Sequence, residues 1–281
     1  MIISRTPLRI SFLGGGSDYA QWYEEHDGAV LATTINKYCY VMLHEGKSWK
    51  TFDLPTESGL GSSSAYTVGL LRACTILDKL AIANLATTWE QDKMAGNVGA
   101  QDQFLCALGG FHLLRFSRHG LRDQIVPFEN TKSLESYLML FDTHQYRRAS
   151  TLVAYQMAEM RRHKKLYFRI AEMSDEALKL LLVNDLSGFG LLLDEAWQIK
   201  KQLSKYITTP AIDAIYNTAK QAGAKGGKLL GGGGGGFILF FAEPEKHEKI
   251  RGMLPDLTYV PFNFENEGTQ VILNSDFRIK L

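Results

Sequence analysis

Three glycine clusters, each joined directly to an apolar segment, constrain what this chain can fold into more than any other feature. They lie at residues 14–16, 59–61 and 223–236, and the last contains six consecutive glycines, from 231 to 236. Flexible linkers are polar on both sides, whereas these clusters border apolar runs. Glycine in this setting indicates close approach of the backbone to another segment or to a ligand.

The middle cluster is followed by three serines and suits a phosphate group. Residues 59–65 read Gly-Leu-Gly-Ser-Ser-Ser-Ala, and an apolar run continues from 66 to 71, as in a helix. A helix N-terminus presents free N–H groups and the positive end of the helix dipole, which attract phosphate. Taken alone, the stretch fits two structures equally: a loop for nucleotide phosphates and a metal ion, or a Gly/Ser loop with a serine N-cap.

Two familiar glycine fingerprints do not fit this chain. The phosphate loop G-x-x-x-x-G-K-[ST] needs Ser or Thr after Gly-Lys, and here Gly227-Lys228 is followed by Leu229. The run 231–236 satisfies the Rossmann pattern only because every residue in it is glycine. An apolar, strand-like stretch follows that run, where a Rossmann loop would begin a helix.

The three clusters together resemble the motifs of the GHMP small-molecule kinases, which include galactokinase, homoserine kinase and mevalonate kinase. The first family motif has the form P-x-R-x-x-x-x-G-x-x-x-D-Y, the second is P-x-x-x-G-L-G-S-S, and the third is a glycine-rich segment near the C-terminus. The matching residues are Pro7, Arg9, Gly14, Asp18 and Tyr19 for the first, Pro55, Gly59, Leu60, Gly61, Ser62 and Ser63 for the second, and 226–236 for the third.

A narrower branch of the family matches better. The variant P-L-R-I-S-F-x-G-G-G-[ST]-D-Y at residues 7–19 is similar to heptose 7-phosphate kinases and to the kinase part of fucokinases, and so are residues 99–104, 109–111 and 222–231. The resemblance implies an α+β fold with an N-terminal, ribosomal-S5-like ATP-binding domain at 1–134 and a ferredoxin-like domain at 135–281, with the site between them. Predicted strands and helices in mixed order also indicate the α+β class.

The resemblance implies that ATP and Mg²⁺ bind at the second motif. Mg²⁺ takes oxygen ligands and keeps waters, so one serine hydroxyl and one carboxylate suffice beside the phosphate oxygens. Ser63 aligns with the family's metal-binding serine, although Ser62 or Ser64 could serve. Glu90 is the matching carboxylate, unless it is only an exposed helix residue. The expected nucleotide-binding residues are Gly59, Leu60, Gly61, Ser62, Ser63 and Ser64.

Two residues are expected to carry the chemistry of the acceptor hydroxyl. Asp102 resembles the family's catalytic aspartate, and the dipole of a helix that begins there would keep its carboxylate ionised. Its alternative role is a simple helix cap. Arg9 is the expected electrostatic partner, which would lower the proton affinity of the acceptor. Otherwise it is a surface arginine at the end of a strand.

The remaining site residues are expected to hold the acceptor sugar. Asp18 would bind sugar hydroxyls or cap a helix, and the glycines beside it leave room for the sugar. Arg147 or Arg148 could clamp a distal phosphate, although His144 stands where the family commonly has glycine. The third motif either approaches the acceptor or only packs closely. The expected substrate residues are Gly15, Gly16, Asp18, Arg147, Lys228, Gly233 and Gly234.

Composition excludes several other classes of function. The 31 basic and 30 acidic residues nearly cancel, so a general polyanion-binding or nucleic-acid role does not follow. Cys39, Cys74 and Cys106 form neither a zinc spacing nor an even disulfide set, so buried free thiols in a reducing compartment are expected. No apolar stretch reaches membrane-spanning length and no signal-peptide pattern is present, so we expect a cytoplasmic location and no membrane partner.

The sequence pattern also predicts individual elements. Strands are expected over 1–13, 112–116, 137–142, 237–242, 258–262 and 270–274, with paired strands across 29–44 that turn at Asn36-Lys37. Helices are expected over 17–26 with Ser17 as N-cap, and over 62–78, 81–95, 102–108, 149–170, 175–204, 210–222 and 244–254.

One departure from the family concerns length. The segments before Pro55 and between Leu77 and Trp89 are shorter than the resemblance leads us to expect. Either the natural chain carries additional residues at these two points, or the corresponding family residues are deleted in this protein. Such a deletion would remove much of the pocket for the nucleotide base. An intact-protein mass well above 31.5 kDa would support the first explanation, and a mass equal to it would exclude that explanation.

The resemblance implies an ATP-dependent sugar kinase acting on a small-molecule sugar phosphate, as a monomer or homodimer. The expected reaction is phosphorylation of the anomeric hydroxyl of D-glycero-D-manno-heptose 7-phosphate to the 1,7-bisphosphate. The alternatives are a fucokinase-like or other sugar 1-kinase, and a non-catalytic sugar sensor on the same scaffold. The presence of Glu90, Asp102 and the serines argues against a sensor.

Overall fold

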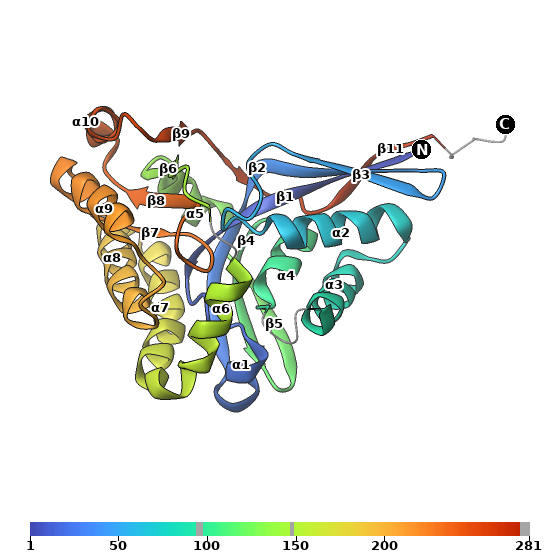
Figure 1. Ribbon diagram of the computed structural model, residues 1–281, viewed down its shortest axis with the longest axis horizontal. Helices are drawn as coiled ribbons and strands as arrows, with labels where there is room; N and C mark the ends of the chain where they lie inside the picture. The colour runs from blue at the N-terminus through green and yellow to red at the C-terminus, as the bar shows by residue number, and fades with distance from the viewer. Residues whose placement is uncertain (94–97, 147–148, 276–281) are drawn as a thin grey trace.

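The chain folds around two antiparallel sheets with helices packed against them (Figure 1). The structure, a computed structural model, describes residues 1–93, 98–146 and 149–275. Within these residues, no helix is both long and apolar enough to cross a membrane.

The first sheet is built mainly from the N-terminal half of the chain. Its order is β11-β1-β2-β4-β5, and β3 and β10 also pair with β2. The strands are β1 (Ile2–Leu13), β2 (Gly28–His44), β3 (Lys47–Phe52), β4 (Phe111–Ser117), β5 (Gly120–Ile125), β10 (Phe264–Glu265) and β11 (Gln270–Asn274). The last two return from the C-terminal end of the chain, so a division at 134/135 separates the two sheets except for these strands.

The second sheet has the order β7-β8-β6-β9. Its strands are β6 (Leu138–Asp142), β7 (Gly226–Leu229), β8 (Phe237–Phe241) and β9 (Thr258–Val260). Along the chain, helices separate β6 from β7 and β8 from β9, which gives the β-α-β-β-α-β pattern of a ferredoxin-like unit. The predicted architecture of the C-terminal half is therefore confirmed.

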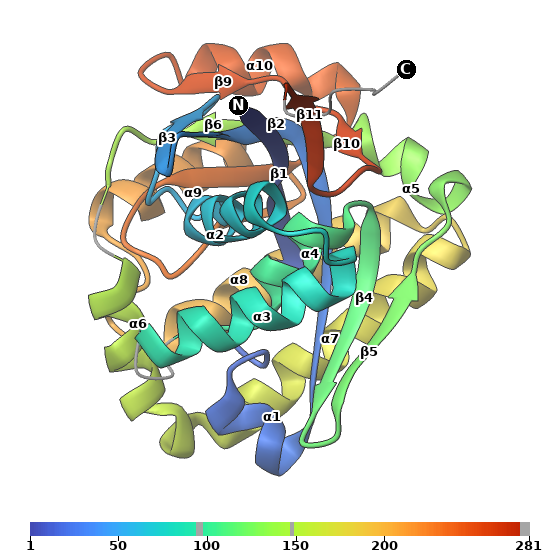
Figure 2. The same cartoon turned by 90° about the vertical axis from the view of Figure 1, so that its right-hand side faces the viewer.

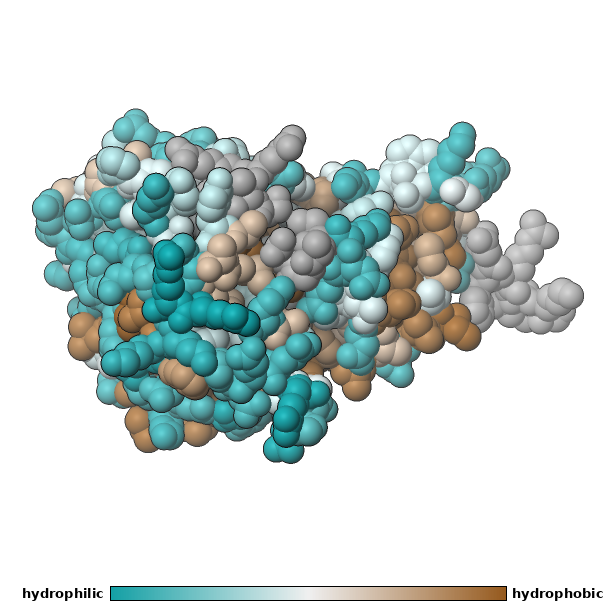
Figure 3. All heavy atoms as spheres, turned by 60° about the horizontal axis from the view of Figure 1, so that its bottom comes forward, coloured by the Kyte–Doolittle hydropathy of each residue, from teal (hydrophilic) through white to brown (hydrophobic). Residues whose placement is uncertain are grey.

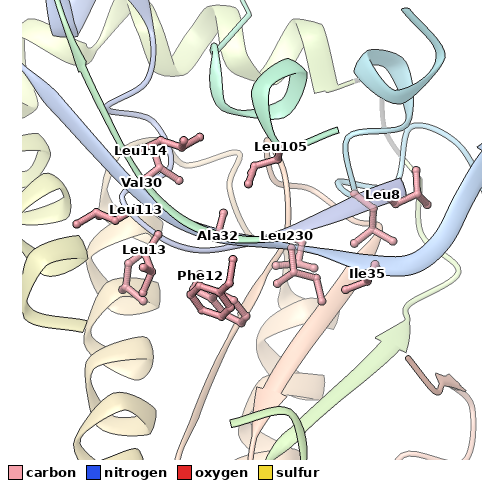
Figure 4. Packing of buried hydrophobic residues seen from close by; sticks show 14 of the residues in the cluster. Leu8, Phe12, Leu13, Val30, Ala32, Ile35, Leu105, Leu113, Leu114 and Leu230 are labelled. Carbon is pink, nitrogen blue, oxygen red and sulfur yellow. The ribbon is translucent and has the colours of Figure 1, made fainter. Parts of the chain in front are cut away.

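Helices cover both faces of the first sheet, which explains why the interior strand β1 is buried over most of its length. From Thr6 to Leu13 every residue of β1 is buried. Helices α2 and α4 pack on β1 and β2, as do α7 and, on β1, α8. Figure 4 shows Leu105 of α4 on one side of these strands and Phe12 and Leu230 on the other. Leu230 directly precedes the glycine run, so the core fixes where that run begins.

The helices are named in chain order, and α2, α3 and α4 lie together beside the first sheet (Figure 2). They are α1 (Ala20–His26), α2 (Ser62–Cys74), α3 (Lys79–Lys93), α4 (Gln101–Leu108), α5 (Phe128–Glu135), α6 (Ala149–Ala158), α7 (Lys164–Leu182), α8 (Leu186–Gln202), α9 (Pro210–Ala222) and α10 (His247–Met253), with short 3₁₀ turns at Met160–His163 and Pro244–Lys246.

Several predicted element boundaries are wrong. The paired strands expected across 29–44 are a single strand, β2, with a bulge: Pro7 pairs with Tyr38 and Leu8 with Ile35, so 36–37 are extra residues. The N–H of Asn36 instead donates to the carbonyl of Asn263, which holds the bulge in place. The pattern around Asn36-Lys37 predicts a turn, because only tertiary pairing reveals a bulge.

The long helical region after β6 is also divided differently from the prediction. The predicted interruption near 171–174 lies inside α7, and the helical region is interrupted instead at residues 183–185, between α7 and α8. Asn184 adopts a left-handed φ of 56°, and the side chain of Asp185 accepts a hydrogen bond from the N–H of Gly188 to cap α8. At α1 the expected N-cap is wrong as well, because Ser17 bonds to the backbone of Gly14 and Ala29.

The surface carries an apolar patch at the end where α2, α3 and β11 lie (Figure 3). Exposed apolar side chains of this region are Ile76, Leu77, Leu80, Leu85, Ile272 and Leu273.

Among the cysteines, Cys39 and Cys106 are buried as expected. Cys74 is exposed at the C-terminal end of α2, so the prediction of three buried thiols is wrong at this residue.

Candidate active site

The three glycine clusters meet around one cavity of about 410 Å³. Each cluster contributes a pair of glycines to its lining: Gly15 and Gly16, Gly59 and Gly61, and Gly231 and Gly232. Charged side chains from β1, α3, α4, α8 and β7 complete the wall. Segments far apart in the sequence therefore form one pocket rather than three separate sites.

The second and third clusters touch backbone to backbone. A Cβ atom on Gly59 would lie 2.4 Å from the carbonyl oxygen of Leu230, and a Cβ on Gly231 would lie 2.4 Å from the Cα of Gly59. Real Cβ atoms do not approach other atoms so closely, so both positions exclude any side chain. The prediction that these glycines permit close backbone approach is confirmed.

Arg9 and Asp102 form a bidentate ion pair within this cavity. Arg9 Nε donates to Asp102 Oδ1 at 2.6 Å, and Nη2 donates to Oδ2 at 2.8 Å. Arg9 is buried, so the alternative of a surface arginine is wrong. Burial acts to lower the pKa of Arg9, but the charge and hydrogen bonds of Asp102 outweigh it and raise that pKa above its ordinary value. Gly61 lies against the pair, with its Cβ position 3.4 Å from Asp102 Oδ2.

Glu90 is buried and held by three side-chain donors, so it is not an exposed helix residue. Ser64 Oγ donates to Oε2 at 2.7 Å, Thr67 Oγ1 donates to Oε1 at 2.6 Å, and Gln103 Nε2 also reaches Oε2. Burial raises the pKa of Glu90, although these hydrogen bonds oppose the shift. Ser63, the serine that sequence alignment favours, is exposed on the first turn of α2 and lines the cavity. The side chain in contact with Glu90 is thus Ser64.

The oxygen donors around Glu90 fit a hard cation. A carboxylate has about four acceptor positions, and the three donors leave capacity for a further ligand on Glu90. The described part of the chain contains no group of three or more His, Cys, Asp or Glu side chains that could hold a metal ion. One carboxylate with serine hydroxyls is therefore the available donor set, and it suits Mg²⁺ that arrives with a nucleotide and keeps its waters.

Asp18 lines the same cavity as Asp102 and contacts the first glycine cluster. It accepts hydrogen bonds from Gly16 N at 2.9 Å and from Gln101 N and Nε2 at 3.2 and 3.0 Å. Burial raises the pKa of Asp18, and these bonds partly counteract the shift. Asp18 does not cap α1, whose N-cap is Tyr19, but it does bind the first N–H of α4. Gly99 packs against it, because a Cβ there would lie 2.1 Å from Asp18 Oδ2.

Several expected site residues lie elsewhere. Gly233 and Gly234 do not line the cavity: a Cβ on Gly233 would lie 2.8 Å from the Cα of Ile207, and Gly234 N donates to the carbonyl of Ile207 at 2.9 Å. Gly231 and Gly232 occupy the cavity wall in their place. The side chain of Leu60 is in the core, while its carbonyl accepts the N–H of Arg9.

The segment after β6 matters for the expected phosphate clamp. Arg147 and Arg148 lie outside the described residues. His144 adopts a left-handed φ of 55°, which accounts for the family's use of glycine at this position. Its N–H donates to Asp142 Oδ1 at 2.8 Å, a local bond that supports the turn.

Two lysines stand in the cavity wall, and sequence reasoning missed one of them. Lys228 Nζ donates to the carbonyl of Phe12 at 2.7 Å. Lys200 Nζ donates to the carbonyls of Leu229 at 3.2 Å and Gly231 at 2.6 Å. Lys200 follows Leu193 and Trp197 on the buried stripe of α8, and a lysine in an apolar stripe is a signal that could have revealed it.

Comparison with known proteins agrees with the motifs. A model of the GHMP kinases N terminal domain matches residues 36–110, and a model of the GHMP kinases C terminal region matches residues 177–257. The D-glycero-alpha-D-manno-heptose 7-phosphate kinase of Campylobacter jejuni subsp. jejuni serotype O:2 is 27% identical over 334 aligned positions, which cover 96% of this chain and 98% of the relative. Because the alignment is longer than this 281-residue chain, the relative contains segments without a counterpart here.

A second relative is the bifunctional fucokinase/GDP-fucose pyrophosphorylase of Arabidopsis thaliana. It is 26% identical over 229 residues, which cover 75% of this chain but only 21% of that much longer protein.

Solved structures show the same fold. A D-glycero-D-manno-heptose 1-phosphate kinase from Bacteriodes thetaiotaomicron superposes with a TM-score of 0.77 at 23% identity, covering 98% of this chain and 99% of the other. Galactokinase from Lactococcus lactis, solved with galactose, gives a TM-score of 0.74 at 17% identity and covers 96% and 94%. With both family models matched in order and the motif residues gathered in one cavity, the chain belongs to the GHMP kinases.

Proposed function

We propose that this chain is an ATP-dependent sugar kinase that phosphorylates the anomeric hydroxyl of D-glycero-D-manno-heptose 7-phosphate and yields the 1,7-bisphosphate by direct in-line transfer. The observation that carries the proposal is the position of the Arg9–Asp102 pair. It shares one cavity with the serine-rich loop and with Asp18. A kinase needs a donor site and an acceptor site that meet at a base, and this arrangement offers a candidate for each.

The donor phosphates would bind at residues 59–64. The first turn of α2 offers free N–H groups, with Gly61 as its N-cap, so a polyphosphate can lie across the helix N-terminus. Glu90 with Ser63 or Ser64 would hold Mg²⁺, which neutralises charge on the phosphate oxygens when bound. Phosphoryl transfer depends mainly on such positioning and charge stabilisation.

The acceptor would lie against Asp18, Gly15 and Gly16. Asp18 would accept hydrogen bonds from sugar hydroxyls, and the two glycines line the same cavity without side chains of their own. Asp102 would receive the proton of the attacking hydroxyl. Arg9 orients that carboxylate, since both oxygens already accept hydrogen bonds from its guanidinium. A remaining lone pair on Asp102 can face the acceptor.

The heptose substrate is supported by the Campylobacter relative, whose match extends over nearly the whole chain. A fucokinase-like sugar 1-kinase is the second candidate, favoured by the similarity to the Arabidopsis fucokinase. A non-catalytic sugar sensor is the third, but it gives no reason for a buried Glu90 and a paired Asp102.

An ATP-consumption screen over D-glycero-D-manno-heptose 7-phosphate, fucose, galactose and mannose tests the proposal. We expect Mg²⁺-dependent turnover with the heptose 7-phosphate. Turnover on unphosphorylated sugars alone would reject that substrate in favour of the second candidate, and binding of a sugar without any turnover would favour the sensor.

A further inference from the structure

Two lysines of the cavity, Lys228 buried and Lys200 partly buried, lack a counter-charge. Lys200 on α8 and Lys228 on β7 both line the cavity, and neither forms an ion pair with any carboxylate in the described ranges 1–93, 98–146 and 149–275. Lys228 is only 6% exposed. Burying an ammonium group without an anion is costly, so such a group is retained where an anion arrives.

Both ammonium groups keep donors for a ligand. Lys200 uses two N–H bonds on the carbonyls of Leu229 and Gly231, and Lys228 uses one on the carbonyl of Phe12. Because an ammonium group has three N–H donors, one remains on Lys200 and two remain on Lys228. These contacts are all with carbonyl oxygens, which fix the position of the groups without neutralising them.

The surroundings of the two lysines are largely cationic. Arg9 acts electrostatically on both, and Lys200 acts on Lys228, while Asp18 is the acidic group that acts on Lys228. Burial and these like charges lower the pKa of each lysine. An anion placed between the lysines and Arg9 would relieve this repulsion. Gly231 and Gly232 leave that part of the wall free of side chains.

Building on the proposed function, we propose that Lys200 and Lys228 are catalytic residues that bind the phosphoryl group during its transfer. The bond between the anomeric oxygen and the γ-phosphorus forms as the bond from that phosphorus to the β,γ-bridging oxygen breaks. The hydroxyl proton passes to Asp102, and ADP leaves. The lysines donate hydrogen bonds to the non-bridging oxygens of the transferred group and exchange no proton. Their positive charges stabilise the negative charge on those oxygens. They belong to the C-terminal part of the chain, whereas the α2 loop belongs to the N-terminal part.

A phosphate monoester at this position could come from ATP or from the distal phosphate of the acceptor. The arrangement favours the transferred group, because both lysines line the cavity together with Arg9, which holds the proposed base. The two sources predict different results when the acceptor lacks its own phosphate.

The test uses the full chain with Lys200→Met, Lys228→Met, the double variant and the conservative Lys200→Arg. Lys201→Met is the matched control, since Lys201 is adjacent on α8 but pairs with Asp213 at 3.7 Å and does not line the cavity. We expect each Met variant to lower kcat about 10²–10³-fold, as for loss of one oxyanion donor. The KM for ATP should change less than about threefold, Lys200→Arg should recover most of the rate, and Lys201→Met should match wild type.

Three results would overturn the proposal: a kcat within about threefold of wild type in the double variant, a purely KM effect, or a loss restricted to the 7-phosphorylated acceptor, which would assign the lysines to the distal phosphate. Equal losses with heptose and heptose 7-phosphate support the transferred group.

A binding measurement separates this proposal from the function itself. If the wild-type protein phosphorylates no sugar, the proposed kinase function is rejected. The anion subsite is then tested separately, with inorganic phosphate as the probe. Phosphate should raise the melting temperature of wild type and of Lys201→Met but not of the double variant. Equal stabilisation of all three would contradict an anion subsite, and should the double variant not fold, Lys200→Met alone is compared in the same way.

Discussion

Arg9 and Asp102, 93 residues apart in the sequence, are joined by two parallel hydrogen bonds of 2.6 and 2.8 Å. The third guanidinium nitrogen of Arg9 donates to the carbonyl of Gly59. One arginine therefore sets the orientation of the proposed base and the position of the phosphate loop at the same time. A change at Arg9 is therefore expected to disturb both donor and acceptor geometry.

Replacing Arg9 by lysine should abolish most turnover while keeping the positive charge. Lysine cannot form the planar, two-bond contact, so Asp102 and Gly59 lose their shared anchor. We expect kcat to fall about 10²–10³-fold in steady-state assays. Arg115→Lys is the control, because Arg115 makes a comparable bidentate pair with Asp175 away from the cavity and half-exposed. A normal rate in Arg9→Lys, or an equal loss in the control, would count against the assignment.

Gly61→Ala should inactivate the protein through the site rather than through the fold alone. Gly61 has a φ of 75°, and a Cβ there would lie 3.2 Å from Arg9 Cγ and 3.4 Å from Asp102 Oδ2. The left-handed conformation costs about 1–2 kcal/mol in any alanine. Gly46→Ala shares a φ of 72° but has nothing within 4 Å, so it isolates that cost. We expect similar melting temperatures for both variants and a loss of kcat only for Gly61→Ala.

Gly99→Ala should weaken sugar binding. A Cβ at Gly99 would meet Asp18 Oδ2 at 2.1 Å and push the carboxylate out of place. Loss of one hydrogen bond to a charged group, about 1.5–3 kcal/mol, corresponds to a rise in the acceptor KM of roughly tenfold or more. Gly252→Ala on α10 is the control, since no atom lies within 4 Å of its Cβ position. Unchanged acceptor KM in Gly99→Ala would exclude Asp18 as a sugar ligand.

The pH dependence of the reaction should report on Lys200. Burial, and then the charge of Arg9, lower its pKa from 10.5 to about 8. Since the charged form is proposed to act, kcat/KM should fall as pH rises through about 8, and Lys200→Arg should remove that descending limb. A limb that persists in Lys200→Arg would belong to another group.

The lowered pKa of Lys200 affects the stability of the fold in the opposite direction, because it makes the folded chain more stable as pH rises. Between about 8 and 10.5 the unfolded chain binds more protons at Lys200 than the folded chain does. The contribution of Lys200 to the free energy of unfolding therefore rises with pH across this window, because the cost of burying its charge is present below it and disappears above it. Urea titrations of wild type and Lys200→Met over this range measure the contribution directly.

The sequence predicted those parts of the fold that apolar periodicity or a motif encodes. The strand at 270–274 was predicted to the residue because turn residues bound a short apolar run. The helix from Pro210 began as predicted, with Thr209 capping it and proline in the first turn. The edge strand β5 was missed because it is largely exposed and lacks an apolar alternation.

Features that depend on tertiary contact were beyond the sequence. The bulge at Asn36 exists because that residue pairs with Asn263, which no local pattern shows. Within the glycine run every residue looks alike, so Gly233 and Gly234 were expected at the substrate, yet they pack on Ile207. Ser64 rather than Ser63 faces Glu90, because Ser63 is exposed on the first turn of α2 while Ser64 is buried, a detail that the three-serine run leaves open.

The most direct measurement of the central claim compares turnover and ATP binding in Asp102→Asn, with Asp92→Asn on the exposed face of α3 as control. Asparagine keeps the shape of Asp102 but cannot take the acceptor proton. The proposed role predicts that kcat with heptose 7-phosphate falls about 10²–10⁴-fold, while the Kd for ATP and the activity of the control remain near wild type. Full turnover in Asp102→Asn would show that Asp102 is not the base and would contradict the site as described.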